Sequence, residues 1–367
     1  MKAFDNLAES EDLYKKHETR KLEKNQAILM IEALCKIHNV ENVPRIIKDL
    51  QDCGFNFEKE LEDYTKSMAE GKDLISRAAH QLLKCGGKRL RPMVLALIAG
   101  RNPSSRKAVD SLATAIELIH SATLLHDDVM DLGEIRRKEP TSRMLYGNNA
   151  SILAGDQLLV DAIRAYSIYK PELLEDTLKT IESMIHAEAL QLENSKKFPW
   201  SRQLHQSICE GKTASLFALA CKTGASLGAY NEEEIELFHE FGTELGVAFQ
   251  IMDDVLDLTG DFTSLGKKLF ADLGDGKMTL PLILTWESYP ELKDSLVKIL
   301  VADEDDDFAE TAFTIRSLVS KSGAGERCYE AARARIDRCQ EILNQMPKDS
   351  LIETLSVIAS LTLERKG

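Results

Sequence analysis

Apolar residues recur at intervals of three and four along several long segments of the chain. The clearest segments cover residues 112–131, 151–166, 173–192 and 233–258. This spacing predicts helices with one buried face, whereas alternating β-branched runs joined by hairpin turns are scarce, Asp275-Gly276 being the exception. We therefore predict an all-α fold, a bundle of about ten or more helices around a central cavity.

Two of these helical segments carry the same acidic pattern, DDxxD. The copies are Asp127-Asp128-Val129-Met130-Asp131 and Asp253-Asp254-Val255-Leu256-Asp257. The first and fifth residues of each copy share a helix face and repel each other, and the apolar flanks indicate partial burial, where uncompensated carboxylates are costly. Mg²⁺ is a natural compensation, because it binds one or two carboxylates together with water and phosphate oxygens. The alternative is a solvated acidic helix face, which suits a single motif better than a repeated one.

Neither acidic motif has His or Cys beside it at the spacing typical of zinc sites. Basic residues instead stand in groups near apolar segments, where Lys offers a mobile charge and Arg a fork matched to phosphate oxygens. These groups are Lys88 to Arg91, Arg136-Arg137, Lys212, Lys267 and Lys277. A basic residue on an acidic chain often only pairs with surface carboxylates, but the grouping here favours a diphosphate ligand.

As a set, these motifs resemble the trans-isoprenyl diphosphate synthases of the polyprenyl synthetase family, which condense isopentenyl diphosphate with an allylic diphosphate. The matching residues occur in the family's order over residues 86–283. They are Gly86 to Pro92, Glu117 to His120, both acidic motifs, Arg136-Arg137 with Pro140-Thr141, Leu153 to Asp156, Gly211 to Thr213, Phe249-Gln250, Leu265 to Lys267, Asp272-Leu273 and Gly276 to Pro281. The resemblance implies the isoprenoid synthase fold and a medium-chain or long-chain type, such as a geranylgeranyl or polyprenyl diphosphate synthase.

The resemblance also implies a role for each matching side chain. Two or three Mg²⁺ ions per active site, or Mn²⁺ in their place, would be bound by Asp127, Asp128, Asp131, Asp253, Asp254 and Asp257. The allylic diphosphate would contact Arg136, Lys212, Thr213, Gln250, Lys267 and Lys277. Isopentenyl diphosphate would lie beside Lys88, Arg91, His120 and Arg137. His120 has a plainer alternative, a histidine satisfied within its own helix.

Electrostatics explains why such a site needs no protein nucleophile. Breaking the allylic carbon–oxygen bond puts negative charge on the diphosphate, and fixed cations stabilise that charge most in the transition state. Asp127, Asp131, Asp253, Lys212 and Lys267 are therefore the residues that we expect to carry catalysis. Water must be kept away from the allylic cation.

The length of the product is predicted from residues shortly before the first acidic motif. In the family the prenyl tail runs down between helices from this motif, and bulky residues near Ala122 and Thr123 stop its growth in short-chain members. The small Ala122 predicts geranylgeranyl diphosphate or a longer product. Ile119 and Ile116 lie deeper and either close the tunnel or belong to the core.

The chain departs from the family pattern in two loops. Lys138 follows the paired arginines where the family usually has glycine, and Lys268-Leu269-Phe270 replaces the usual Pro-x-Gly after Lys267. Ala214 replaces a glycine that is common in the family after Thr213. These changes affect loop geometry near the diphosphate, while the charged residues are all retained.

Composition narrows the remaining possibilities. The net charge is −14, which argues against nucleic acid as a partner. We expect no transmembrane segment and no signal peptide, because early apolar runs are far too short. The seven cysteines are odd in number and lack CxxC spacing, so we predict reduced thiols and a cytoplasmic protein, with weak peripheral membrane contact to deliver a long product.

The sequence also predicts the domain organisation and the assembly of the protein. We predict an N-terminal helical extension at residues 1–54 and a catalytic domain at residues 55–367. The charged extension packs on the core in our preferred interpretation, and the alternatives are a longer dimer contact or a site for another protein. The resemblance implies a homodimer.

Two other functions fit part of the pattern. A class I terpene cyclase also ionises an allylic diphosphate with DDxxD-bound magnesium, but it needs no site for isopentenyl diphosphate. Lys88, Arg91, His120 and Arg137 therefore favour the condensing enzyme. The second alternative is a noncatalytic subunit of a heteromeric synthase, which the two intact acidic motifs disfavour.

Overall fold

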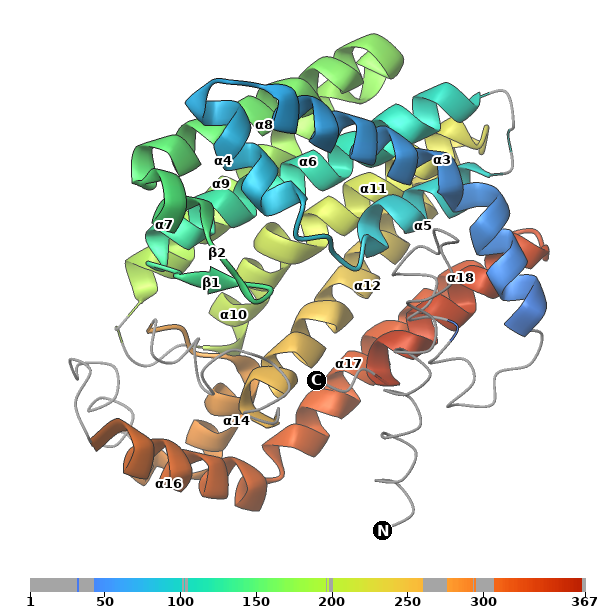
Figure 1. Cartoon of the computed structure of the whole chain (residues 1–367). Coiled ribbons are helices and arrows are strands. Elements are labelled where there is room, and N and C mark those ends of the chain that lie inside the picture. The colour runs from blue at the N-terminus through green and yellow to red at the C-terminus, as the bar shows by residue number, and fades with distance from the viewer. Residues whose placement is uncertain are drawn as a thin grey trace.

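The structure is a computed structural model that describes residues 43–100, 105–195, 201–259, 276–292 and 307–364, with a few isolated positions between them. These residues form a bundle of helices with one very short hairpin (Figure 1). The α-helices are α3 (Val43–Glu70), α4 (Leu74–Leu83), α5 (Leu90–Ala99), α6 (Arg106–Met130), α7 (Ser142–Tyr146), α8 (Asn148–Tyr169), α9 (Leu174–Asn194), α10 (Arg202–Cys209), α11 (Ser215–Leu227), α12 (Glu232–Thr259), α14 (Leu280–Ser288), α16 (Asp307–Ser322), α17 (Ala324–Leu343) and α18 (Ser350–Leu361).

Shorter elements join the long helices. The hairpin pairs β1 (Ile135–Arg136) with β2 (Glu139–Pro140) in antiparallel register. Short turns of helix occur at η2 (Pro171–Leu173), η3 (Glu210–Ala214), η4 (Pro290–Leu292) and η5 (Thr362–Glu364). Among these, η3 is a π-helical turn, a form that often marks a functional site.

Side chains of the sequence fix where several helices begin. Asp73 accepts a hydrogen bond from the backbone N–H of Ser76 at 2.8 Å and caps α4. Ser201 caps α10 in the same way, through the N–H of Leu204 at 3.1 Å. Pro281 occupies the first turn of α14, where its missing N–H removes no helical hydrogen bond. Local sequence therefore sets the start of these helices, of which α10 and α14 adjoin the site described below.

Buried apolar side chains form two clusters. The first is built mainly by α3, α4, α6 and α8, and the second mainly by α12, α14, α17 and α18, while α5 and α11 contribute to both. Within the bundle, α6 packs chiefly on α8, and α12 packs on α11 and α17 (Figure 1). This packing fixes α6 and α12, the two helices that carry the acidic motifs.

One helix in the described part of the chain, α6, has the length and hydropathy of a membrane-crossing segment. Its apolar window is 72% buried inside the protein. Leu112, Ile116 and Ile119 are each 0% exposed and pack against neighbouring helices. We therefore interpret α6 as the central core helix of the bundle.

The observed fold confirms the all-α prediction. The four segments with helical spacing correspond to α6, α8, α9 and α12. The β1–β2 hairpin was not predicted, because its strands are too short to show alternation. The predicted division at residues 54 and 55 falls inside α3, most of the proposed extension lies outside the described residues, and the division stays a prediction.

Candidate active site

The first acidic motif closes the C-terminal end of α6. Asp131 is the residue that ends the helix, and its Oδ2 accepts a hydrogen bond from Nζ of Lys277 at 2.7 Å. Asp128 is buried, and Nε and Nη2 of Arg136 both lie 2.8 Å from its Oδ1. Carboxylates at a helix C-terminus face the negative end of the helix dipole, so this motif depends on cations from other elements.

Asp127 shows the cost of gathering these carboxylates. Burial raises its pKa to about 6, and the nearby Glu188 and Asp131 raise it further, while Lys212 and Lys277 act in the opposite direction. Its side chain is 18% exposed, so it faces the site rather than the core. An additional cation beside Asp127 would restore its ionised form.

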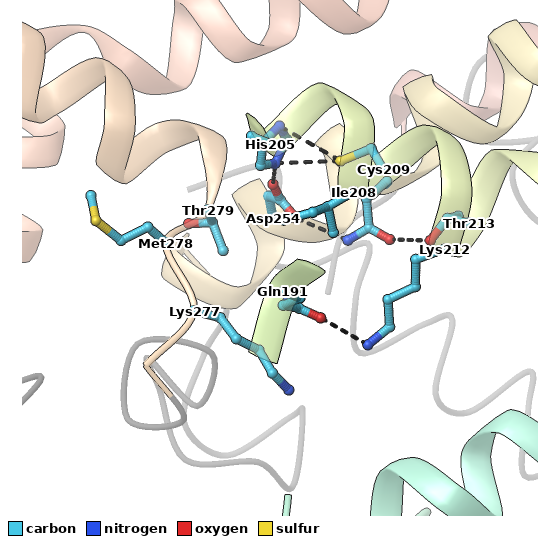
Figure 2. Close-up of a pocket in the computed structure, with 11 residues that line it drawn as sticks. Gln191, His205, Ile208, Cys209, Lys212, Thr213, Asp254, Lys277, Met278 and Thr279 are labelled. Carbon is cyan, nitrogen blue, oxygen red and sulfur yellow. Dashed lines mark hydrogen bonds and ion pairs between the residues drawn. The ribbon is translucent and has the colours of Figure 1, made fainter. Parts of the chain in front are cut away.

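Lys212 reaches the first acidic motif from the π-helical turn η3. Its Nζ lies 3.9 Å from Oδ2 of Asp127 and forms an ion pair with Glu188. It also donates to Oε1 of Gln191 at 3.0 Å, as Figure 2 shows. Glu188 and Gln191 lie on α9 and were missed in the sequence. Their only signal there is a pair of polar residues three positions apart on a helix, so they belong to the site on structural grounds.

The π-helical turn also depends on a close approach to α9. A Cβ atom added at Gly211 would lie 2.6 Å from Cβ of Ala187 and 3.0 Å from the backbone oxygen of Ser183. We expect Gly211→Ala to destabilise the protein by about 1–3 kcal/mol, measured as the free energy of unfolding in urea. The matched control is Gly325→Ala on α17, where the added Cβ meets nothing within 4 Å, and equal destabilisation by both changes would contradict this packing.

The second acidic motif lies near the end of α12, and its second residue, Asp254, is held inside the protein. Oδ2 of Asp254 lies 2.6 Å from Nε2 of His205 and accepts from the N–H of Leu280 at 3.1 Å. Its Oδ1 accepts from Nε2 of Gln250 at 2.9 Å (Figure 2). Asp254 is 3% exposed, so its carboxylate serves this network, whereas Asp253 and Asp257 are only partly buried.

His205 is a further residue that the sequence did not single out. It is buried on α10, and its ring also lies 3.5 Å from Sγ of Cys209. Burial alone would lower the pKa of His205, but the neighbouring Cys209 and Asp254 raise it to about 10. His205 is therefore a cationic partner of Asp254, and only the fold brings these two helices together.

Two segments connect the acidic motifs to each other. In η3, Lys212 approaches Asp127, and Oγ1 of Thr213 donates to Oε1 of Gln250 at 2.7 Å, which in turn binds Asp254. In the segment that leads into α14, residues 277–280, Lys277 binds Asp131, and the N–H of Leu280, the first residue of the helix, binds Asp254. A cavity of about 120 Å³ lies between these segments, and Lys212 and Lys277 extend to the same side of it (Figure 2).

A separate basic cluster lies beside the first motif. His120 is held in its neutral form, because burial and nearby positive charges keep its pKa well below the ordinary value. These charges belong to Arg91, Arg137, Arg89 and Arg136. The guanidinium of Arg91 lies 4.5 Å from the ring centre of Phe217. A Cβ added at Gly87 would meet the guanidinium of Arg137 at 3.0 Å. The structure thus brings together residues from three predicted motifs, with the exposed Lys88 at the edge.

Carboxylate oxygens are the available metal ligands of this site. Within the described residues, no three His, Cys, Asp or Glu side chains converge tightly enough to hold a metal alone. Mg²⁺ commonly completes its shell with water and phosphate oxygens, and the raised pKa of Asp127 shows a carboxylate that a cation would stabilise. The donor set therefore fits Mg²⁺ bound together with a phosphorylated ligand.

Comparison with known proteins identifies the family. The family model for polyprenyl synthetase matches residues 72–315. A short chain isoprenyl diphosphate synthase from Methanothermobacter thermautotrophicus is 33% identical over 80% of this chain and 91% of its own length. The chain belongs to the polyprenyl synthetase family. A geranylgeranyl diphosphate synthase from Sulfolobus acidocaldarius is 30% identical over 83% of this chain and 96% of its own.

A solved structure supports the same assignment. The polyprenyl synthase of Caulobacter crescentus, in complex with calcium and isoprenyl diphosphate, superposes with a TM-score of 0.80 at 29% sequence identity. The match covers 89% of this chain and 98% of that synthase. The predicted family and isoprenoid synthase fold are confirmed.

The residues predicted to set product length in this polyprenyl synthetase lie on α6. Ala122 and Ile119 are 0% exposed on α6, and Oγ1 of Thr123 donates to the backbone oxygen of His120 at 2.8 Å. Lys267 and Phe270 lie outside the described residues. The roles predicted for individual site residues, including metal binding by Asp128 and Asp254, stay predictions.

The hairpin shows the consequence of replacing a family glycine by Lys138. Lys138 adopts φ of 69° and its neighbour Arg137 adopts 52°, a left-handed conformation that costs a residue with a Cβ about 1–2 kcal/mol. We expect Lys138→Gly to stabilise the protein by about 1 kcal/mol in urea unfolding. Lys138→Ala removes the charge but keeps the Cβ, so stabilisation by that control to the same extent would contradict the conformational cause.

Proposed function

We propose that this protein is a magnesium-dependent trans-prenyltransferase. It condenses isopentenyl diphosphate head-to-tail (1'-4) with an allylic diphosphate and gives a trans-prenyl diphosphate, geranylgeranyl or longer. The observation that carries the proposal is a pair of segments, η3 and residues 277–280, that each place a lysine beside the first acidic motif. Each segment also connects to Asp254 of the second motif, directly through the N–H of Leu280 and, for η3, through Gln250. The printed functions of the related synthases agree with it.

The metal ligands follow from helix geometry. Asp127 and Asp131 share a face of α6, because residues four apart on a helix are neighbours, and Asp253 and Asp257 repeat this arrangement on α12. Asp128 and Asp254 are also engaged with Arg136 and His205, which fixes their position, and metal binding by these two residues stays a prediction. Bound Mg²⁺ would neutralise the diphosphate and favour its departure.

The protein's own cations act on the same leaving group. Lys212 and Lys277 are held by Glu188, Gln191 and Asp131, so they are positioned before the substrate arrives. As the allylic carbon–oxygen bond breaks, its electron pair goes to the diphosphate, and cations fixed around it stabilise that charge in the transition state. Their placement in a site partly closed from water also protects the allylic cation.

The basic cluster around His120 would bind the second substrate. The positive charges of Arg91 and Arg137 that hold His120 neutral are matched to a diphosphate. The double bond of isopentenyl diphosphate then forms the new carbon–carbon bond, and the proton it loses goes to the released diphosphate. A terpene cyclase has no need of this cluster, which favours the condensing reaction.

We further propose a homodimer located in the cytoplasm. Leu178, Ile185 and Leu192 on α9 are 42%, 60% and 48% exposed, and their seven-residue spacing makes an apolar stripe suited to a second helix surface. Cys85, Cys209, Cys221, Cys328 and Cys339 are free thiols, which supports a reducing compartment. Sedimentation of the purified protein measures the first of these proposals directly.

The proposed function is tested by omission. Purified protein is incubated with farnesyl diphosphate, isopentenyl diphosphate and Mg²⁺, and then with each component left out in turn. We expect diphosphate release only from the complete mixture. Release of hydrocarbon without isopentenyl diphosphate would indicate a cyclase, and inactivity of the complete mixture would favour a noncatalytic subunit.

A further inference from the structure

A buried ion pair joins the basic loop before α5 to the middle of α6. Arg89 pairs with Oε1 of Glu117 through Nη1, and the two side chains are only 9% and 4% exposed. Nη2 of Arg89 also lies 3.5 Å from the backbone oxygen of Leu83 at the end of α4. Removing two charges from water costs several kcal/mol per ion, so a pair of this kind needs a reason beyond stability.

The backbone at Arg89 is also unfavourable. Arg89 immediately precedes α5 with φ of 49° and makes no side-chain cap for that helix. The left-handed conformation costs about 1–2 kcal/mol for a residue with a Cβ, and such strain persists where the surroundings enforce it. The pair with Glu117 is the contact that can hold Arg89 in this conformation.

The neighbours of the pair are the residues that we assign to isopentenyl diphosphate. Lys88 precedes Arg89 on the loop, Arg91 lies in the first turn of α5, and His120 follows Glu117 by about one turn of α6. Arg89 is close enough to contribute to the low pKa of His120. Glu117 itself would repel a diphosphate, so it is not a ligand.

Two carboxyl groups lie near Arg89, those of Glu117 and Glu58, and the ion pair is formed with Glu117. Glu58 on α3 also feels the charge of Arg89, but burial raises the pKa of Glu58 to about 7. Its negative charge is therefore incomplete near neutral pH. The ion pair with Glu117 is the one that fixes the direction of the Arg89 side chain.

We infer that the Arg89–Glu117 pair positions the isopentenyl diphosphate site, by fixing Lys88 and the start of α5 with Arg91 against the α6 segment that carries His120. This inference rests on the proposed function. Neither residue touches substrate in this account, so both are positioning residues. Their loss should weaken the binding of isopentenyl diphosphate and leave the allylic site between η3 and α12 intact.

The test separates the two substrates. Glu117→Gln keeps the shape of the side chain and removes its charge, and we expect it to raise KM for isopentenyl diphosphate by about 10- to 100-fold, the range typical for a lost supporting contact. KM for the allylic diphosphate should stay within about twofold. Arg89→Lys, which keeps the charge but loses the fork, should give an intermediate KM.

A matched control addresses a purely structural role. Glu244→Gln removes the charge of another partly buried pair, with Arg335, that joins α12 to α17, and it should change neither KM. Thermal melting of all variants identifies unfolding, and if Glu117→Gln fails to fold, Arg89→Lys carries the test. Equal increases in both KM values, or no increase in either, would overturn the inference.

Binding without turnover keeps this test apart from the proposed function. Calorimetric titration of the wild-type protein with isopentenyl diphosphate should show binding that Glu117→Gln weakens by the same factor as KM. If the wild type is active and Glu117→Gln binds isopentenyl diphosphate with unchanged affinity, the positioning role alone is overturned. Absence of both binding and turnover in the wild type would overturn the proposed function together with the inference.

Discussion

Asp127→Asn is expected to lower kcat by about a thousandfold or more and, in metal-free buffer, to make the protein more stable. Loss of a metal ligand removes several kcal/mol of transition-state stabilisation, and each 1.36 kcal/mol is a factor of about ten. The gain in stability comes from Asp127 itself, whose pKa is raised to about 6 by burial and by the carboxylates around it. A neutral amide avoids that cost.

The pH dependence gives the sign of this effect. The pKa of Asp127 in the folded protein lies above the ordinary value of 3.8, so the folded state binds the proton more tightly than the unfolded state. Stability contributed by the protonated carboxyl is present at low pH and is lost as pH rises from about 4 through 6. At pH 7.5 with a chelator, Asp127→Asn should therefore gain about 1–3 kcal/mol in urea unfolding, with little gain at pH 4.

Asp110 provides a matched control on the same helix. Burial also raises the pKa of Asp110 to about 6, but it lies near the start of α6, far from both acidic motifs. Asp110→Asn should stabilise the protein in the same direction without loss of turnover, and by a smaller amount because Asp110 is only partly buried. Turnover of Asp127→Asn within tenfold of the wild type would contradict the metal role assigned to Asp127.

Ala122→Phe is expected to shorten the product by at least one five-carbon unit. Ala122 is 0% exposed and precedes Asp127 by a little more than one turn of α6, where we predict that the growing prenyl tail enters the bundle. A phenyl ring there would fill the space that a longer tail requires. Mass spectrometry of the prenyl diphosphates from the wild type and the variant, given the same primer, measures the change.

A buried aromatic substitution can also act through overpacking alone, at a cost of about 1–3 kcal/mol. Ala113→Phe is the control, because Ala113 is also 0% exposed but points to the opposite side of α6, nine residues away on a helix of 3.6 residues per turn. It should reduce stability and leave product length unchanged. An unchanged product from Ala122→Phe would refute the assignment of Ala122 as the floor.

The helices that carry the site could be predicted because their apolar residues repeat with the helical period. Residues 112–131 and 233–258 gave α6 and α12, and the acidic motifs on them indicated metal and diphosphate. Helix geometry could have gone further. The second residue of each motif lies about 100° from the first on its helix, so contacts of Asp128 and Asp254 with other parts of the chain could also have been expected.

The supporting residues could not be predicted, because they act through contacts between distant segments. Glu188 and Gln191 are ordinary polar residues of α9 until η3 places Lys212 beside them. His205 becomes a partner of Asp254 only because α10 packs against the end of α12. The π-helical form of η3 likewise leaves no periodic signal in five residues, although it sets the direction of Lys212.

The central claim is that two diphosphates bind at different places and are joined by a new carbon–carbon bond. Its most direct test uses isotopically labelled isopentenyl diphosphate, unlabelled allylic primers of graded length, Mg²⁺ and the purified protein, with mass spectrometry of the intact products. The account predicts prenyl diphosphates that contain one primer and a whole number of labelled five-carbon units, reaching geranylgeranyl or longer. Products without label, or no prenyl diphosphate from any primer, would contradict it.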